Sequence, residues 1–195
     1  IRSCLSRGRN HIKEYMEKRY GFEAQQRIIV TTDAEHGSLK KIVDKQGYRQ
    51  FVVPNDIGGR YSVFTPVGLL PIAIAGIDIV EFTNGAKQAG QDFSSTTPAK
   101  NDACQYAFAR FDLYERGYAV ELLASFEPRL NKLHEWSKQL FGESEGKERK
   151  GLYPSTVNYS TDLHAIGQFI QEGSPILFET LIHFAELEED VTIPF

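Results

Sequence analysis

Residues 27–53 read RIIVTTDAEHGSLKKIVDKQGYRQFVV, and this stretch decides the fold class. Residues 27–32 form a short run that is rich in β-branched side chains, which is typical of a buried strand. Residues 38–45 predict a helix, for which Asp33 is a candidate cap. Residues 48–53 predict a second strand. A strand, a helix and a strand in this order indicate an α/β fold with a mostly parallel sheet.

The same alternation resumes after residues 91–101, which are rich in Ser and Thr, contain Pro98 and predict a linker or an exposed loop. Residues 1–10 show no clear period, so no element is predicted for them. The remaining predicted helices cover residues 11–20, 66–74, 102–116, 128–141 and 162–171. The remaining predicted strands cover residues 119–126, 156–159 and 176–184.

The composition is that of a globular protein, with 41% apolar and 25% charged residues in 195. A net charge of -4 argues against a nucleic-acid-binding protein, which usually carries a basic surface. The longest apolar run, residues 67–77, is too short to span a bilayer, and no signal peptide is evident. Two cysteines in a chain of this length form no disulfide framework and favour a reducing, cytoplasmic location.

The first candidate site is residues 56–62, DIGGRYS. The adjacent glycines Gly58 and Gly59 allow a positive φ or a close approach of a ligand to the backbone. Arg60 follows a predicted strand, at the edge of the sheet where ligands bind in open α/β folds. Its guanidinium is suited to a phosphate or a developing oxyanion. Without further context, a tight turn whose Arg60 pairs with a surface carboxylate is the better interpretation.

The second candidate site is residues 142–147, GESEGK, which we expect to form a loop just past a helix. A carboxylate on such a loop can face a cleft and act as a general base. A solvated acidic loop is the commoner case, and the residue types alone do not choose between Glu143 and Glu145.

The third candidate site is residues 159–168, YSTDLHAIGQ. We expect His164 in the first turn of a helix that Ser160 or Thr161 caps. A neutral imidazole there can accept a proton from a hydroxyl group and return it. A lone histidine on a helix is more often structural or solvated. The spacing of the other histidines suits no metal site, and we interpret them as structural or solvated: His11, His36, His134 and His183.

These three stretches together resemble one known family, the glucose-6-phosphate isomerases. Residues 56–68, DIGGRYSVFTPVG, closely resemble a signature of that family, and LLPIA at residues 69–73 is similar to its bacterial members. Residues 139–147, QLFGESEGK, resemble the segment that carries the catalytic base. DLH at residues 162–164, followed by GQ at residues 167–168, resembles the segment of the ring-opening histidine.

The resemblance extends over nearly the whole chain from about His11. It implies a parallel-sheet sandwich of the sugar-isomerase (SIS) type, with parts of two such domains in this chain. Residues 1–90 would be the C-terminal part of the first domain, residues 91–101 a linker or loop, and residues 102–195 the N-terminal part of the second.

The resemblance also implies the reaction, which is the interconversion of glucose 6-phosphate and fructose 6-phosphate. Glu143 is then the base that moves a proton between C2 and C1, and Arg60 stabilises the cis-enediolate. Gly59 and Gln139 contact the sugar, and His164 opens its ring in the site of the neighbouring subunit, which implies a homodimer. No metal and no redox cofactor is needed, because a fixed cation meets the charge and only a proton moves.

Two features of the family are missing, namely the Ser/Thr-rich phosphate loop, which residues 1–10 do not match, and a later segment with a catalytic lysine. We therefore expect an internal fragment that is inactive or nearly so alone. One alternative is a non-catalytic sugar-phosphate-binding module of the same domain type. Another is the isomerase part of an amidotransferase that makes glucosamine 6-phosphate, which the GGRYS run and the Glu143 segment oppose. A third is a folding remnant with exposed sheet edges.

Overall fold

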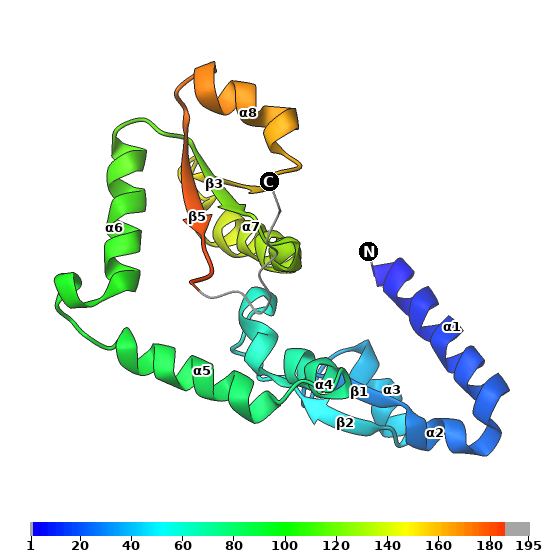
Figure 1. Ribbon diagram of the computed structural model, residues 1–195. Coiled ribbons are helices and arrows are strands. Elements are labelled where there is room, and N and C mark those ends of the chain that lie inside the picture. Colours follow the sequence, from blue (N-terminus) through cyan, green and yellow to red (C-terminus); the bar gives the residue numbers. More distant parts are fainter. Residues whose placement is uncertain (1, 186–195) are drawn as a thin grey trace, which may run out of the picture. The chain divides into compact units, whose positions relative to one another are not determined.

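The computed structural model describes residues 2–185 and divides the chain into two compact units, Ile1–Lys87 and Gln88–Phe195 (Figure 1). The boundary falls inside helix α5 (Ile79–Asp92), which the sequence pattern did not predict. Gly85 and Gly90 weaken the helical pattern of this segment. The division of the chain into parts of two sugar-isomerase domains stays a prediction. None of the described helices is both long and apolar enough to cross a membrane.

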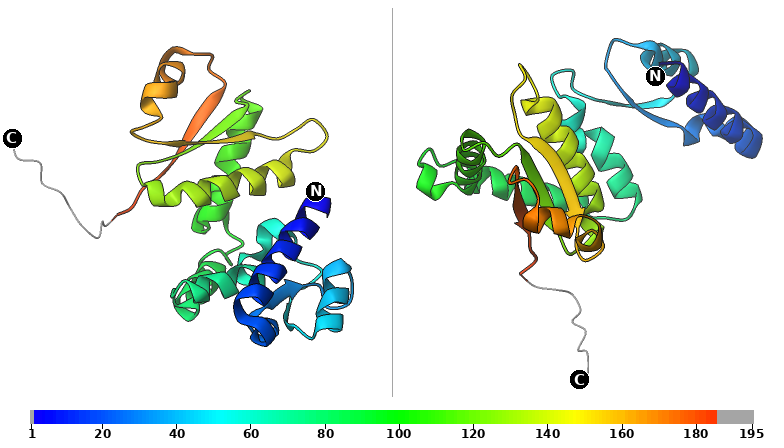
Figure 2. Two further views of the ribbon diagram at one scale, coloured as in Figure 1. Left: turned by 90° about the vertical axis from the view of Figure 1, so that its right-hand side faces the viewer. Right: turned by 90° about the horizontal axis from the view of Figure 1, so that it is seen from above.

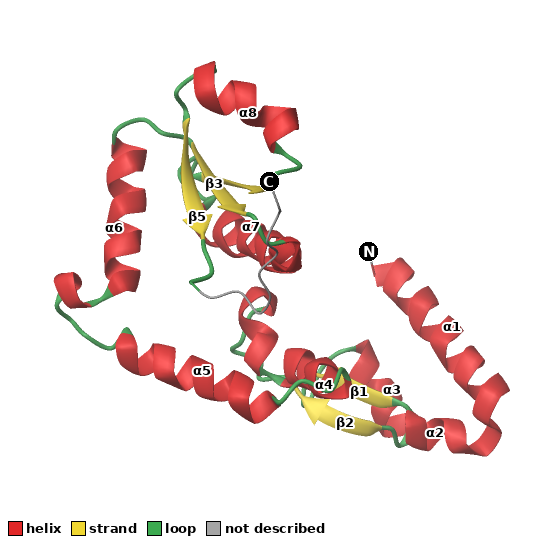
Figure 3. Ribbon diagram, in the orientation of Figure 1, coloured by secondary structure: helices red, strands yellow, loops and turns green. Residues whose placement is uncertain are grey.

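Unit 1 begins with a long helix and continues through a strand, a helix and a second strand to two further helices (Figure 3). Its elements are α1 (Arg2–Tyr20), a 3₁₀ helix (Gly21–Glu23), α2 (Ala24–Arg27), β1 (Ile29–Thr32), α3 (Ser38–Gln46), β2 (Arg49–Val52), a 3₁₀ helix (Gly59–Phe64), α4 (Pro66–Ile74) and α5.

Helix α1 corrects the expectation that residues 1–10 lack structure, because it begins at Arg2 rather than near His11. Most of its described side chains are exposed. An exposed helix does not need an apolar stripe, so the absence of a hydrophobic period in this segment did not argue against a helix.

The parallel pair β1–β2 confirms the α/β interpretation of residues 27–53. Ile29 lies opposite Arg49, and the register continues along both strands. Helix α3 connects them and ends at Gly47, whose φ of 66° lets its N–H bond to the Val43 carbonyl at 2.8 Å. Asp33 does not cap this helix. Its carboxylate accepts the backbone N–H groups two and three residues further on and so forms the preceding turn.

A turn at residues 55–57 follows β2, and Gly59 then begins a 3₁₀ helix rather than lying in a glycine turn. Gly58 has a φ of -67°, and Gly59 is not among the residues with positive φ, so neither needs the conformational freedom of glycine. The glycine that the packing requires is Gly68 in α4. A Cβ atom there would lie 2.2 Å from the Val63 carbonyl oxygen, because α4 packs directly on the 3₁₀ helix.

Unit 2 is built on a parallel sheet with the strand order β4–β3–β5 (Figure 3). Its elements are a 3₁₀ helix (Pro98–Lys100), α6 (Asp102–Glu115), β3 (Val120–Ser125), a 3₁₀ helix (Pro128–Leu130), α7 (Asn131–Glu145), β4 (Tyr153–Asn158), α8 (Leu163–Glu172) and β5 (Leu177–Ile182). Several predicted boundaries were wrong, two of them by three residues or more where α7 connects to β4. Strand β4 begins at Tyr153 rather than at residue 156, and α7 continues past Gly142 to Glu145.

The sheet of unit 2 has two faces of different character, and α7 and α8 lie on opposite sides of it (Figure 2). Right-handed crossovers to both sides of the central strand β3 require this arrangement. The face toward α8 is apolar, and its core consists of Leu122, Ala124 and Val157 with Ile166 and Ile170 packed against them. On the opposite face, toward α7, Glu121 and Ser125 of β3 form a buried polar layer, with the partly buried Leu123 between them.

Apolar residues at helical spacing in α7 do not form the core on this side, because Leu133 and Trp136 are 38% and 39% exposed. The α7 side chains with less than a tenth of their surface exposed are those of His134 and Ser137. The sheet below α7 is polar at this point, so polar helix residues are buried against it.

The contact of α4 with the 3₁₀ helix makes Gly68→Ala a test of the fold of unit 1. The added methyl group would meet backbone atoms that cannot move aside cheaply. We expect a loss of about 1–3 kcal/mol in the free energy of unfolding, measured in urea. The matched control is Gly85→Ala in α5, where a Cβ atom meets nothing within 4 Å. It should stabilise the protein by about 0.5–1 kcal/mol, and an equal loss in both variants would contradict the packing argument.

Candidate functional site

Gly59 and Arg60 lie past the carboxyl end of β2, at the edge where we expected them. The Ser62 hydroxyl donates to the Gly59 carbonyl at 2.7 Å, and the buried Thr65 hydroxyl donates to the Ser62 carbonyl at 2.7 Å. These two bonds hold the backbone of the 3₁₀ helix. A Cβ atom on Gly59 would meet nothing within 4 Å, so open space lies beside the backbone next to Arg60.

The guanidinium of Arg60 lies over the ring of Tyr61, with its Cζ atom 5.1 Å from the ring centre. Arg60 is half-buried, and this stacking restricts its long side chain without neutralising the charge. The contact with Tyr61 helps to fix the direction of the guanidinium at the end of the strands. Gly59 and Arg60 belong to unit 1, whereas the other predicted site residues belong to unit 2.

Gln139 and Glu143 lie one turn apart on an exposed face of α7, and the Gln139 amide donates to the Glu143 carboxylate at 3.3 Å. The expectation that Glu143 lies on a loop was wrong. Gly142 remains helical and does not end the helix. Gly146 is its C-cap, and the N–H of Gly146 still bonds to the Gly142 carbonyl at 3.1 Å. A carboxylate on a helix is better fixed in direction than one on a loop.

His164 is exposed and lies in the first turn of α8, as predicted. The expected cap was wrong, because Asp162 is the N-cap and makes no side-chain bond to the helix. Its carboxylate instead accepts the Asn158 N–H at 2.7 Å and so ties the helix start to the end of β4. Leu163 is 44% exposed, whereas Ile166 and Ile170 pack against the core of the sheet.

Glu143 and His164 lie near opposite ends of the strands in the sheet of unit 2. The last turn of α7 lies beside the amino end of β4, where a Cβ atom on Gly142 would be 3.6 Å from Pro154. His164 instead follows the carboxyl end of that strand. Six strand residues span about 16 Å. The two side chains of one chain are therefore too far apart to act on the same small group of atoms.

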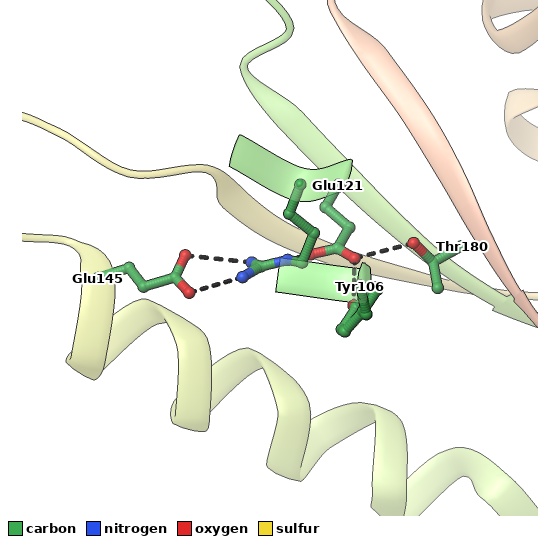
Figure 4. Close-up of polar contacts among 5 residues, drawn as sticks. Tyr106, Glu121, Glu145 and Thr180 are labelled. Atoms are coloured by element: carbon green, nitrogen blue, oxygen red, sulfur yellow. Dashed lines mark hydrogen bonds and ion pairs between the residues drawn. The ribbon is translucent and has the colours of Figure 1, made fainter. Parts of the chain in front are cut away.

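A buried ion network, which the sequence interpretation missed, connects α6, β3 and α7 (Figure 4). Arg110 of α6 is 7% exposed and donates through Nε to Glu121 at 2.6 Å. Its Nη1 and Nη2 atoms donate to the two carboxylate oxygens of Glu145 at 2.6 and 3.1 Å. The other oxygen of Glu121 accepts the hydroxyls of Tyr106 and, at 2.8 Å, of Thr180.

The electrostatics of this network keep its members in defined states. Burial alone would lower the pKa of Arg110, but the hydrogen bonds of Glu145 and Glu121 outweigh it and the pKa is raised. Burial, with the hydrogen bond to Glu121 second, raises the pKa of the Tyr106 hydroxyl. The signal in the sequence was Glu121 itself, one carboxylate inside the apolar run of residues 119–126, since a buried charge requires a partner.

A second polar group lies further along the same face. The ring of His134, 1% exposed, is 3.2 Å from the hydroxyl of the fully buried Ser125. The Ser137 hydroxyl donates to the His134 carbonyl at 2.7 Å. Among the described residues, neither His134 Nδ1 nor the nearby Asn158 Oδ1 has a hydrogen-bond partner. Within residues 2–185, no cluster of His, Cys, Asp and Glu is arranged to hold a metal ion.

Comparison with known proteins identifies the family. The family model described as phosphoglucose isomerase matches residues 7–186. This chain belongs to the phosphoglucose isomerase family. The match includes all five predicted site residues, in both units.

Curated relatives of the chain are bacterial proteins named glucose-6-phosphate isomerase. The protein from Alkaliphilus metalliredigens is 52% identical over 183 residues, which are 93% of this chain and 41% of that protein. The protein from Listeria monocytogenes is 54% identical over 182 residues, again 93% of this chain and 40% of the relative. The chain thus spans about two fifths of the length of these relatives.

A solved structure has the same fold as this chain. A hypothetical protein from Thermus thermophilus superimposes with a TM-score of 0.82 at 28% identity. The alignment covers 96% of this chain and 46% of that one. The α/β fold with parallel sheets is therefore shared along almost the whole chain.

The buried histidine of the polar layer makes stability depend on pH. Burial, aided by Lys138 and opposed by Glu135, lowers the pKa of His134, so the native ring stays neutral where the unfolded ring gains a proton. This stability is present above the unfolded pKa of about 6.5 and is lost as the pH falls toward the lowered native value.

The free energy of unfolding of the wild type should fall between pH 7.5 and pH 5.5. We expect this fall to be smaller by roughly 1 kcal/mol in His134→Asn. Urea unfolding at both pH values measures the effect. The control is His183→Asn, which changes an exposed histidine of the same unit and should keep the wild-type slope. Equal slopes in wild type and His134→Asn would refute the assignment.

Proposed function

We propose that this chain is part of an enzyme that interconverts glucose 6-phosphate and fructose 6-phosphate through a cis-enediolate. The observation that carries the proposal is the Gln139–Glu143 pair on the exposed face of α7. It lies in a chain that is 52% identical over 183 residues to a protein named for this activity. A positioned carboxylate can act as the general base in a proton transfer between two carbons.

The three charged or titratable residues divide the reaction between them. His164 assists ring opening by moving a proton between the ring oxygen and the O1 hydroxyl. Glu143 then removes the proton from C2 of the open aldose, and the electrons of that bond form the enediolate. Glu143 returns the proton to C1 while the hydroxyl proton of O2 passes to O1, which yields the ketose. Atoms and charge balance without a redox step.

Arg60 meets the charge that develops on the enediolate oxygens. A permanently charged guanidinium stabilises the oxyanion without taking a proton, so the proton remains available to C1. Its contact with the ring of Tyr61 limits the rotamers that must be ordered when the substrate binds. The open space at Gly59 admits the sugar beside the backbone. Gln139 holds Glu143 from one side and binds a sugar hydroxyl with its remaining hydrogen-bonding groups.

The functional protein is a homodimer in this proposal. Glu143 and His164 of one chain lie near opposite ends of the strands of one sheet, so one copy does not bring both residues to one substrate. When two copies are related by a twofold axis, Glu143 of each chain meets His164 of the other, and two equal sites form. The two units are, in the same proposal, parts of two sugar-isomerase domains.

Replacement of the base tests the enzyme assignment in the full-length protein. Glu143→Gln keeps the size of the side chain and its contact with Gln139 but removes the proton acceptor. We expect kcat to fall by about 10²–10⁴-fold while the affinity for fructose 6-phosphate, measured by calorimetry, is kept.

The matched control is Glu135→Gln, which changes another exposed carboxylate of α7, paired with Lys138. It should leave turnover unchanged. Full turnover in Glu143→Gln would instead favour a module that binds sugar phosphates without converting them.

Mixing of two inactive variants tests the two-chain site. Glu143→Gln and His164→Asn subunits, unfolded together and refolded, form mixed dimers in which one site carries both changes and the other carries neither. With random pairing, about a quarter of the wild-type activity should return. Recovery of no activity, with mixed dimers verified by mass spectrometry, would place both residues in the site of one chain.

A further inference from the structure

Arg110 contacts the last turn of α7 on one side of the helix, and Glu143 lies on the opposite side. Phe141 and Glu145 are one turn apart and face α6. The guanidinium of Arg110 lies 4.0 Å from the ring centre of Phe141 and donates two bonds to Glu145. Gln139 and Glu143 are also one turn apart and are exposed.

The geometry of a helix relates these two pairs. Neighbouring residues are separated by about 100° around the axis, so Glu143 lies about 200° from both Phe141 and Glu145. Holding Glu145 inward against Arg110 therefore turns Glu143 outward. A small rotation of the last turn would shift the Glu143 carboxylate sideways by a comparable amount.

The end of a helix does not hold such a rotation by itself. The last carbonyls lack partners within the helix, and terminal turns fray. The C-cap Gly146 has φ -71° and ψ 64° rather than the left-handed conformation that commonly ends helices. The fork from Arg110 supplies the constraint that this cap lacks.

Arg110 is itself held firmly. Its Nε atom donates to Glu121, which sits in the central strand β3 and is 3% exposed. Glu121 also accepts the hydroxyl of Tyr106 from α6 and that of Thr180 from β5. Figure 4 shows the resulting chain of contacts from the sheet through the guanidinium to the end of α7.

We propose that Arg110 is a positioning residue for Glu143, because its fork to Glu145 sets the rotation of the last turn of α7 from the opposite side. This inference rests on the proposed function. It assigns a role in turnover to a side chain that does not touch the substrate. Lysine does not replace it, since one ammonium group cannot bridge Glu121 and both oxygens of Glu145.

The test compares variants of the full-length enzyme by kcat, KM and the deuterium isotope effect for substrate labelled at C2. Arg110→Lys should lower kcat by about ten- to a hundredfold and change KM less than about threefold. The isotope effect on kcat should rise, because proton removal by a misplaced base becomes the slowest step. Glu145→Ala should behave alike, and Glu145→Gln, which keeps one carbonyl acceptor, should restore most of the turnover.

The matched control is Thr180→Val, which removes a bond to Glu121 on the side away from α7. It should lower the melting temperature and leave kcat and the isotope effect unchanged. Glu145 is partly exposed, so its variants report on the fork even if Arg110→Lys folds poorly.

Two outcomes overturn the inference. If Arg110→Lys and both Glu145 variants keep kcat within about threefold, or if Thr180→Val loses turnover in step with them, the network is only structural. Glu143→Gln measured in parallel separates this from a failure of the proposed function. Retained turnover in that variant overturns the function and the positioning role together, whereas its loss leaves the function standing whatever Arg110 does.

Discussion

The carboxylate of Glu121, buried in the central strand of unit 2, is the constraint on which the rest of this unit depends. A charge without a partner at that depth would cost several kcal/mol. The structure provides Arg110, Tyr106 and Thr180 as partners, from a helix and an adjacent strand. Because Arg110 also binds Glu145, satisfying this one carboxylate ties α6, β3, β5 and α7 together. The apolar core on the other face excludes water but does not choose among helix rotations in this way.

Much of the fold could be predicted from local pattern, and the errors have common physical causes. The bounds of α4 were predicted to the residue, and α3 and α6 were each within one residue. Strand β4 was predicted too short because Pro154 argues against a strand, although the register with β3 pairs both Tyr153 and Pro154. The first half of α1 was missed because an exposed helix needs no apolar period, and α5 was missed because Gly85 and Gly90 weaken its helical pattern. In α7, two polar side chains are buried and two large apolar ones are exposed. The sequence of the helix alone could not predict this, because it depends on the polar residues of β3 against which α7 packs.

The predicted site residues came from the sequence, but their geometry did not. Residue type and resemblance selected Glu143 and His164, whereas the sequence placed Glu143 on a loop because Gly142 resembled a helix stop. The structure keeps that glycine helical and ends α7 at Gly146. Gly59 was selected by resemblance, and the positive φ that its residue type allows is not used. Arg110 was not found at all, because partners distant in sequence are recognised only when the fold brings them together.

The separation of Glu143 and His164 along β4 has a consequence for how the activity would begin in a cell. On the proposed two-chain site, a newly made copy has no working centre until it meets a second copy. Catalytic capacity then rises with the square of the subunit concentration at high dilution and becomes proportional to it once pairing is complete. A six-residue strand would thus couple the onset of metabolic flux to protein abundance.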